Sequence, residues 1–115
     1  MSNQNLPKAV RDDITKLQSL EERVRLFSQQ KYAIENSIQE KKKAVEELSE
    51  MEDDAVVYKQ VGGILMHSEK AKVLEDLNDE VSTLEMRKKT IERSESSVTQ
   101  SYEELRKKLN QQLQV

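Results

Sequence analysis

The feature that most constrains this chain is a seven-residue repeat of apolar residues that occurs twice, once on each side of a short central segment. The first repeat runs from Val10 to Leu48 and the second from Leu74 to Gln112. In each repeat nine of the twelve core positions are apolar, counting Tyr102 in the second. Six heptads with charged residues at most other positions are typical of a left-handed coiled coil.

Each repeat consists of two core columns that are three residues apart. The columns of the first repeat are Val10, Leu17, Val24, Lys31, Ile38 and Val45, and Asp13, Leu20, Phe27, Ile34, Lys41 and Leu48. The columns of the second are Leu74, Val81, Lys88, Glu95, Tyr102 and Leu109, and Leu77, Leu84, Ile91, Val98, Leu105 and Gln112. Lys31, Lys41, Lys88 and Glu95 interrupt the apolar seams, which is typical of residues that set register and partner choice. An ion pair between Lys31 and Glu95 is expected if the two repeats pair antiparallel.

Composition agrees with long paired helices and leaves few residues for a globular core. Of the 115 residues 36% are charged, 35% are hydrophobic and 3% are aromatic. The 19 basic and 22 acidic residues are interspersed, which is typical of a solvated helical surface and not of a nucleic-acid interface. The absence of cysteine fits a reducing compartment, and cytoplasmic localisation is expected.

The fold class follows from pairing the two repeats. A helix of about 43 residues would be roughly 65 Å long and cannot be stable alone, so each repeat needs a partner. An antiparallel arrangement brings Leu48 near Leu77 and Val24 near Val98, and aligns the seams along their length. We therefore predict a single domain over residues 1–115, all-α dominated, that is an antiparallel coiled-coil helical hairpin.

The expected helix bounds come from the residues that begin and end helices. The first helix is expected over about residues 7–52, with Pro7 in its first turn, and the second over about residues 68–113. Ser68 is the expected N-cap of the second helix, with Glu69 in its first turn.

The connector between the repeats, about residues 55–67, is predicted to be a β-hairpin. Two β-prone apolar runs flank Gly62-Gly63, the pattern of a two-residue primed turn. Alternation places Val57, Val61, Ile64 and Met66 on one face, and Val56, Tyr58 and Leu65 on the other. A lone hairpin that is apolar on both faces is marginal in water and prone to aggregate, so the sequence implies oligomerisation through it. The residues assigned to this subunit interface are Val56, Val57, Tyr58, Val61, Gly62, Gly63, Ile64, Leu65 and Met66.

The hairpin also carries a family resemblance. The run DDAVVYKQVG from Asp53 to Gly62, followed by Ile64, Leu65 and Met66, resembles the hairpin signature of beta-class prefoldin subunits of the archaeal type. Its place midway between two heptad repeats is also the family's, and a single hairpin distinguishes the beta class from the alpha class.

The resemblance implies an assembly, a function and partners. It implies a hexamer of two alpha-class and four beta-class subunits, whose hairpins close an oligomeric β-barrel. Such a complex is an ATP-independent holdase that binds unfolded polypeptides at the tips of its coiled coils and delivers them to a group II chaperonin. Mapped onto this chain, the resemblance implies that the client-binding tips are Leu6, Val10, Ile14, Leu109, Leu113 and Val115.

Two other classes of function compete with the holdase. A structural coiled-coil adaptor or tether would share the heptads, but it would ignore both unfolded clients and an alpha-class partner. An enzyme has almost no support, because no acid, base and nucleophile candidates converge away from exposed helix surfaces. His67 has no companion ligands, and the lysines at 41–43 are flanked by glutamates. We therefore expect no catalytic residue, cofactor, metal site, nucleic-acid partner or membrane span.

Overall fold

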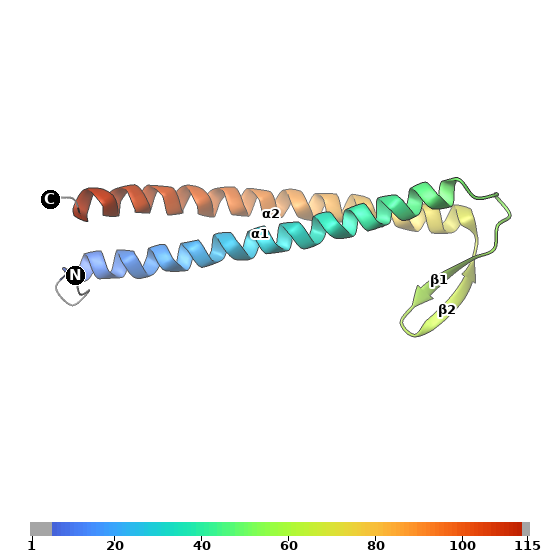
Figure 1. Cartoon of the computed structure of the whole chain (residues 1–115), viewed down its shortest axis with the longest axis horizontal. Coiled ribbons are helices and arrows are strands. Elements are labelled where there is room, and N and C mark those ends of the chain that lie inside the picture. Colours follow the sequence, from blue (N-terminus) through green and yellow to red (C-terminus); the bar gives the residue numbers. More distant parts are fainter. Residues whose placement is uncertain (1–5, 114–115) are drawn as a thin grey trace. The chain divides into compact units, whose positions relative to one another are not determined.

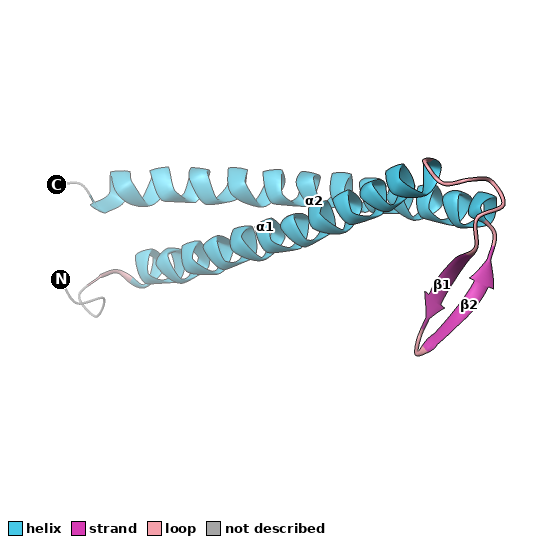
Figure 2. Ribbon diagram, turned by 45° about the vertical axis from the view of Figure 1, so that its right-hand side comes forward, coloured by secondary structure: helices cyan, strands magenta, loops and turns pink. Residues whose placement is uncertain are grey.

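A computed structural model describes residues 6–113 of the chain and contains two long helices joined by a β-hairpin (Figure 1). Helix α1 spans Lys8–Ser49, strand β1 Val57–Val61, strand β2 Ile64–Ser68 and helix α2 Lys70–Leu113. The two strands pair only with each other, as an antiparallel two-stranded sheet (Figure 2). The predicted fold class, all-α dominated with a small β-hairpin, is confirmed.

Contacts divide the described chain into two compact units. The terminal unit consists of residues 6–32 and 90–113, where the first part of α1 lies beside the last part of α2. The hairpin unit consists of residues 33–89, with the rest of both helices, the connector and the hairpin.

The predicted core columns form the seam between α1 and α2 within each unit. Apart from Val57 in the hairpin, every buried apolar residue among those described belongs to these columns. They are Leu20, Val98 and Leu109 in the terminal unit, and Ile38, Leu48 and Val81 in the hairpin unit. The other column members are half-buried, with the exception of Gln112, which is exposed. The helices pair because burying their aliphatic side chains stabilises the pair by about 0.8 kcal/mol for each methylene that is removed from water.

Charged members of the columns are paired across the seam. In the terminal unit Lys31 Nζ lies 3.0 Å from Glu95 Oε1, as the antiparallel register predicts, and Lys108 Nζ lies 3.2 Å from Asp13 Oδ2. In the hairpin unit the pairs are Lys41 with Glu80 at 3.1 Å and Lys88 with Glu35 at 3.4 Å. Lys42 and Glu85, which lie outside the columns, also pair between the helices at 3.3 Å. No charged side chain interrupts the apolar columns without an opposite charge from the facing helix.

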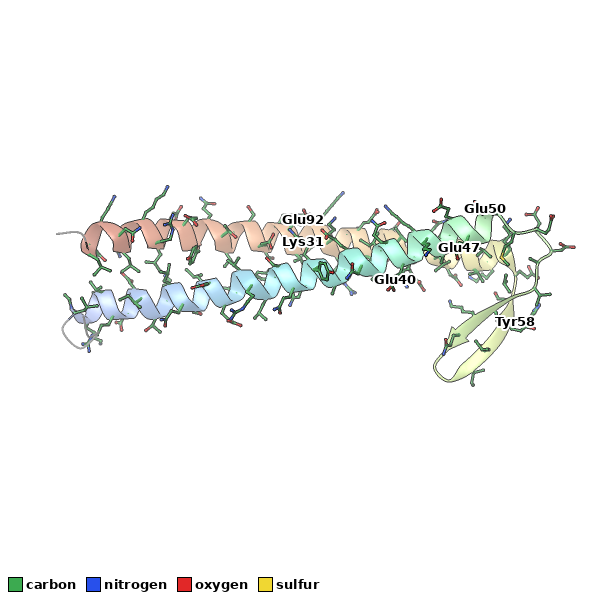
Figure 3. All side chains as sticks on the ribbon, in the orientation of Figure 1. Lys31, Glu40, Glu47, Glu50, Tyr58 and Glu92 are labelled. Atoms are coloured by element: carbon green, nitrogen blue, oxygen red, sulfur yellow. The ribbon has the colours of Figure 1, made fainter. Side chains whose placement is uncertain are left out.

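Glu95 has two partners on α1. Its Oε2 accepts a hydrogen bond from Ser28 Oγ at 2.7 Å, and its Oε1 accepts one from Lys31 Nζ at 3.0 Å. The Ser28 hydroxyl first, and then Lys31, lower the pKa of the Glu95 carboxyl below its ordinary value. Lys31, labelled in Figure 3, thus belongs to a three-residue polar layer within the seam.

The ends of the helices differ from the predicted bounds. Pro7 lies just before α1, and its carbonyl accepts the first helical hydrogen bond, from Arg11 N at 3.0 Å. At the other end α1 stops at Ser49 and does not reach residue 52. Ser49 Oγ donates a hydrogen bond to the Val45 carbonyl at 2.7 Å. The acidic residues that follow are unfavourable next to the negative end of the helix dipole, which disfavours extension of the helix.

The start of α2 also differs from the predicted bound, because the helix begins at Lys70 and not at Ser68. Ser68, the predicted N-cap, is the last residue of β2. The carbonyl of Glu69 accepts from Val73 N at 3.0 Å, so Glu69 and not Ser68 caps the helix. The strand therefore passes into the helix through a single residue.

Candidate functional site

The hairpin turn has the geometry that its two glycines predict. Gly62 adopts φ of 60°, whereas Gly63 lies outside the positive-φ region. A positive φ at the first central residue alone is the mark of a type II′ turn, one of the two primed turns that match strand twist. The turn therefore depends on glycine at position 62 and not at position 63.

Strand register fixes which side chains share a face. Val57 pairs with Ser68, Lys59 with Met66 and Val61 with Ile64 on one face, hereafter the anchored face. Tyr58 pairs with His67 and Gln60 with Leu65 on the opposite face, hereafter the open face. The predicted separation of Val57, Val61, Ile64 and Met66 from Tyr58 and Leu65 agrees with this register. Val56, assigned by alternation to the side of Tyr58, lies just before β1.

The apolar side chains of the hairpin are exposed on both faces. Val56, Tyr58, Val61, Ile64, Leu65 and Met66 are between 51% and 67% exposed. On the open face the Tyr58 ring meets His67 edge-on, with centroids 5.8 Å apart, and Figure 3 labels Tyr58 on this hairpin. Apolar side chains exposed to this extent on both faces of a two-stranded sheet are typical of an interaction site.

Two contacts fix the base of the anchored face. Val57 is 9% exposed and is the buried residue of the hairpin. Lys59 Nζ donates to Asp76 Oδ2 of α2 at 3.2 Å, and Lys72 Nζ lies 3.1 Å from Asp76 Oδ1. Hydrogen bonds from Lys72 and then Lys59 lower the pKa of the Asp76 carboxyl. Sequence reasoning grouped Val57 with the free apolar residues and missed the Lys59 to Asp76 anchor, because it pairs a strand with a helix.

The six residues assigned to the client-binding tips are not alike. Leu6, Val10 and Ile14 are half-buried, and Leu109 is 4% exposed because it belongs to the seam. Leu113, the last residue of α2, is 47% exposed. Val115 lies outside the described residues. The α1 and α2 residues of this set lie at the same end of the terminal unit, as the contact of Lys108 with Asp13 shows.

Within residues 6–113, no three His, Asp or Glu side chains are grouped in a way that could hold a metal ion. Neither α1 nor α2, as described, contains a stretch apolar enough to cross a membrane.

A coiled-coil helical hairpin whose connector is a single β-hairpin, apolar on both faces, is the fold of beta-class prefoldin subunits. A family model described as "Prefoldin subunit" matches residues 11–115. The prefoldin beta subunit of Thermococcus gammatolerans is 38% identical over 110 residues, covering 96% of this chain and 94% of that protein. That of Pyrococcus furiosus is 36% identical over 106 residues, covering 92% and 91%. The crystal structure of the prefoldin beta subunit from Thermococcus strain KS-1 superposes with a TM-score of 0.88 at 33% identity, covering 97% of this chain and 98% of that one.

The chain belongs to the prefoldin family, in its beta class. This is a family of non-enzymatic chaperone subunits, and membership implies assembly with other prefoldin subunits.

Proposed function

We propose that this chain is the beta-class subunit of an ATP-independent holdase that acts in the cytoplasm. In this proposal the whole chain works as one prefoldin-like domain, and four copies assemble with two alpha-class subunits through their hairpins. The complex holds unfolded polypeptides at the coiled-coil tips and passes them to a group II chaperonin.

The observation that carries the assembly proposal is the exposure of apolar residues on both faces of the hairpin. Ile64 is 66% exposed on the anchored face, and Leu65 is 67% exposed on the open face. Burying side chains of this kind stabilises a complex by about 1 to 2 kcal/mol each. Strands of other subunits would also satisfy the unpaired edges of β1 and β2, which a barrel abolishes.

Native mass of the chain, alone and mixed with an alpha-class prefoldin subunit, tests the assembly. We expect a hexamer of two alpha-class and four beta-class subunits. Ile64→Asp and Leu65→Asp are expected to prevent it while leaving helicity unchanged, because both side chains are exposed in the single chain. Val57→Asp is a poorer probe, since Val57 is already buried within its own subunit. A full-size complex formed by the double variant Ile64→Asp/Leu65→Asp would contradict assembly through the hairpin.

The holdase activity is tested separately, by light scattering of a denatured test protein diluted into buffer without nucleotide. We expect the assembled complex to suppress aggregation. A stable dimer that ignores both the alpha-class subunit and the test protein would instead indicate a coiled-coil adaptor.

A further inference from the structure

The residue that opens α2, Lys70, has a side chain that is only 11% exposed although it is charged. Lysine is almost never this buried unless its ammonium is paired. Lys70 stands seven residues before Leu77, so the heptad register places its side chain on the side of α2 that faces α1. The partners of its ammonium therefore define its role.

All three partners of Lys70 lie at the end of α1 or just beyond it. Lys70 Nζ donates to the Met51 carbonyl at 2.7 Å, to the Ser49 carbonyl at 3.3 Å and to Asp53 Oδ1 at 3.2 Å. An ammonium group has three donors, and here each has an acceptor. Ser49 is the last residue of α1, so its carbonyl is among those that a helix end leaves without an internal partner.

Electrostatics explain why a lysine stands at this position. A positive charge in the first turn of α2 is unfavourable to α2 itself, since the N-terminus of a helix carries partial positive charge. The C-terminus of α1 carries partial negative charge and has no basic residue in its own last turn. It is followed by Glu50, Glu52, Asp53 and Asp54. Lys70 thus supplies to α1 the cation that α1 lacks, at the expense of its own helix.

This contact joins the two ends of the segment that holds the hairpin. β2 ends at Ser68, two residues before Lys70, and β1 begins at Val57, a few residues after the carbonyl of Met51. The Lys70 ammonium therefore closes a loop from which the hairpin emerges. The Lys59 to Asp76 pair, the other tether between hairpin and helices, is more exposed, with 43% of the Lys59 side chain accessible.

We propose that Lys70 is the positioning residue for assembly: by clasping the end of α1 to the start of α2, it sets the direction in which the hairpin leaves the helices. This inference rests on the proposed assembly through the hairpin. A hairpin that is held in one direction loses less orientational freedom when subunits join, so the clasp favours assembly by preorganisation.

The test compares three variants of the full chain. Lys70→Met removes the ammonium and keeps much of the side-chain length, while Lys70→Arg keeps the charge. Lys89→Met is the matched control, because Lys89 lies on the same helix, is exposed and is several turns along α2 from the hairpin. Hydrogen exchange is followed at two amides of the connector. The amide of Met51 donates to the Leu48 carbonyl, and the amide of Ala55 donates to the Glu52 carbonyl. Assembly is followed by native mass as a function of subunit concentration in the presence of an alpha-class prefoldin subunit.

We expect Lys70→Met to speed exchange at both amides and to raise the concentration for half-assembly, each by about tenfold, the equivalent of ~1.4 kcal/mol. Lys70→Arg should restore most of the assembly, and Lys89→Met should change neither measurement. Assembly of Lys70→Met at the wild-type concentration, or an equal effect of Lys89→Met, would overturn the proposal. If the wild-type chain does not assemble at all, the proposed function fails, and wild-type exchange rates in Lys70→Met would then overturn the clasp independently.

Discussion

Glu95 illustrates how a single polar residue is accommodated within an apolar seam. It occupies a core column, yet its side chain is 19% exposed and both carboxylate oxygens are bonded to α1. The free energy of desolvating this carboxylate is offset as long as both partners remain bonded to it. The same carboxylate disfavours any helix register that would separate it from Lys31.

The first prediction concerns the pH dependence of this layer. Because Ser28 and Lys31 lower the pKa of Glu95 in the folded chain, the stability that its charge contributes is fully present above the ordinary value of 4.5. It is lost as pH falls below 4.5 through the folded pKa. Glu95→Gln is expected to lower the free energy of unfolding at pH 7 by about 1 kcal/mol and to flatten the pH dependence below 4.5. Urea unfolding followed by circular dichroism at several pH values measures both, with the exposed Glu92 of Figure 3, changed to Gln, as the control. Equal acid sensitivity of Glu95→Gln and wild type would contradict this account.

A second prediction separates the two glycines of the turn. Gly62 has φ of 60°, where a Cβ costs about 1 to 2 kcal/mol, whereas Gly63 has an ordinary φ. At neither position would a Cβ meet another atom within 4 Å, so backbone conformation alone decides the outcome. We expect Gly62→Ala to increase hydrogen exchange of the strand amides by about tenfold, and Gly63→Ala to leave it close to wild type. A larger effect at position 63 than at 62 would show that the turn is not of type II′.

At the scale of the elements, the periodicity of the sequence predicted most of the fold. The heptad columns predicted the seam because burial in paired helices is a repeating property of the side chains. The alternation around Gly62-Gly63 likewise predicted the faces of the hairpin. The clasp of Lys70 escaped notice because two of its three acceptors are backbone carbonyls, which leave no signature in the sequence. The pairs Lys41 to Glu80 and Lys88 to Glu35 could have been found, since the register that predicted Lys31 to Glu95 also aligns them.

The third prediction tests which face of α1 is buried, with two leucines of the same helix. Leu20 is 7% exposed in a core column, whereas Leu26 is 46% exposed and outside the columns. Leu20→Ala is expected to lower the free energy of unfolding by about 3 kcal/mol, because it removes buried methylenes and leaves a cavity in the seam. Leu26→Ala should cost less than about 1 kcal/mol, since its side chain stays largely in water. Chemical denaturation of both variants measures the difference, and equal losses would refute the assigned seam.

At the scale of the whole molecule, an apolar residue that is buried in the seam can contact a client only if free energy is spent to open the seam. Leu109 is buried against the facing helix of its own chain, so presenting it to a client would require the helix ends to separate. Helix ends are the part of a coiled coil where local opening requires least free energy. Leu113 is already exposed, and several copies in one assembly would multiply a weak contact by multivalency.

The fourth prediction distinguishes a residue that holds clients from one that holds the seam. Leu113→Ser is expected to reduce the protection of a denatured test protein, measured by light scattering without nucleotide, while the free energy of unfolding stays within about 0.5 kcal/mol of wild type. Leu109→Ser is expected to lower that free energy by about 3 kcal/mol, so any loss of protection it causes also reflects opened helices. Variants of Leu113 and of the half-buried Leu6 therefore test the proposed client site at the tips. A variant of Leu109 does not, because it also destabilises the seam. If Leu6→Ser and Leu113→Ser together leave protection unchanged in an intact assembly, clients are held elsewhere, and the exposed apolar residues of the hairpin become the surface to examine next.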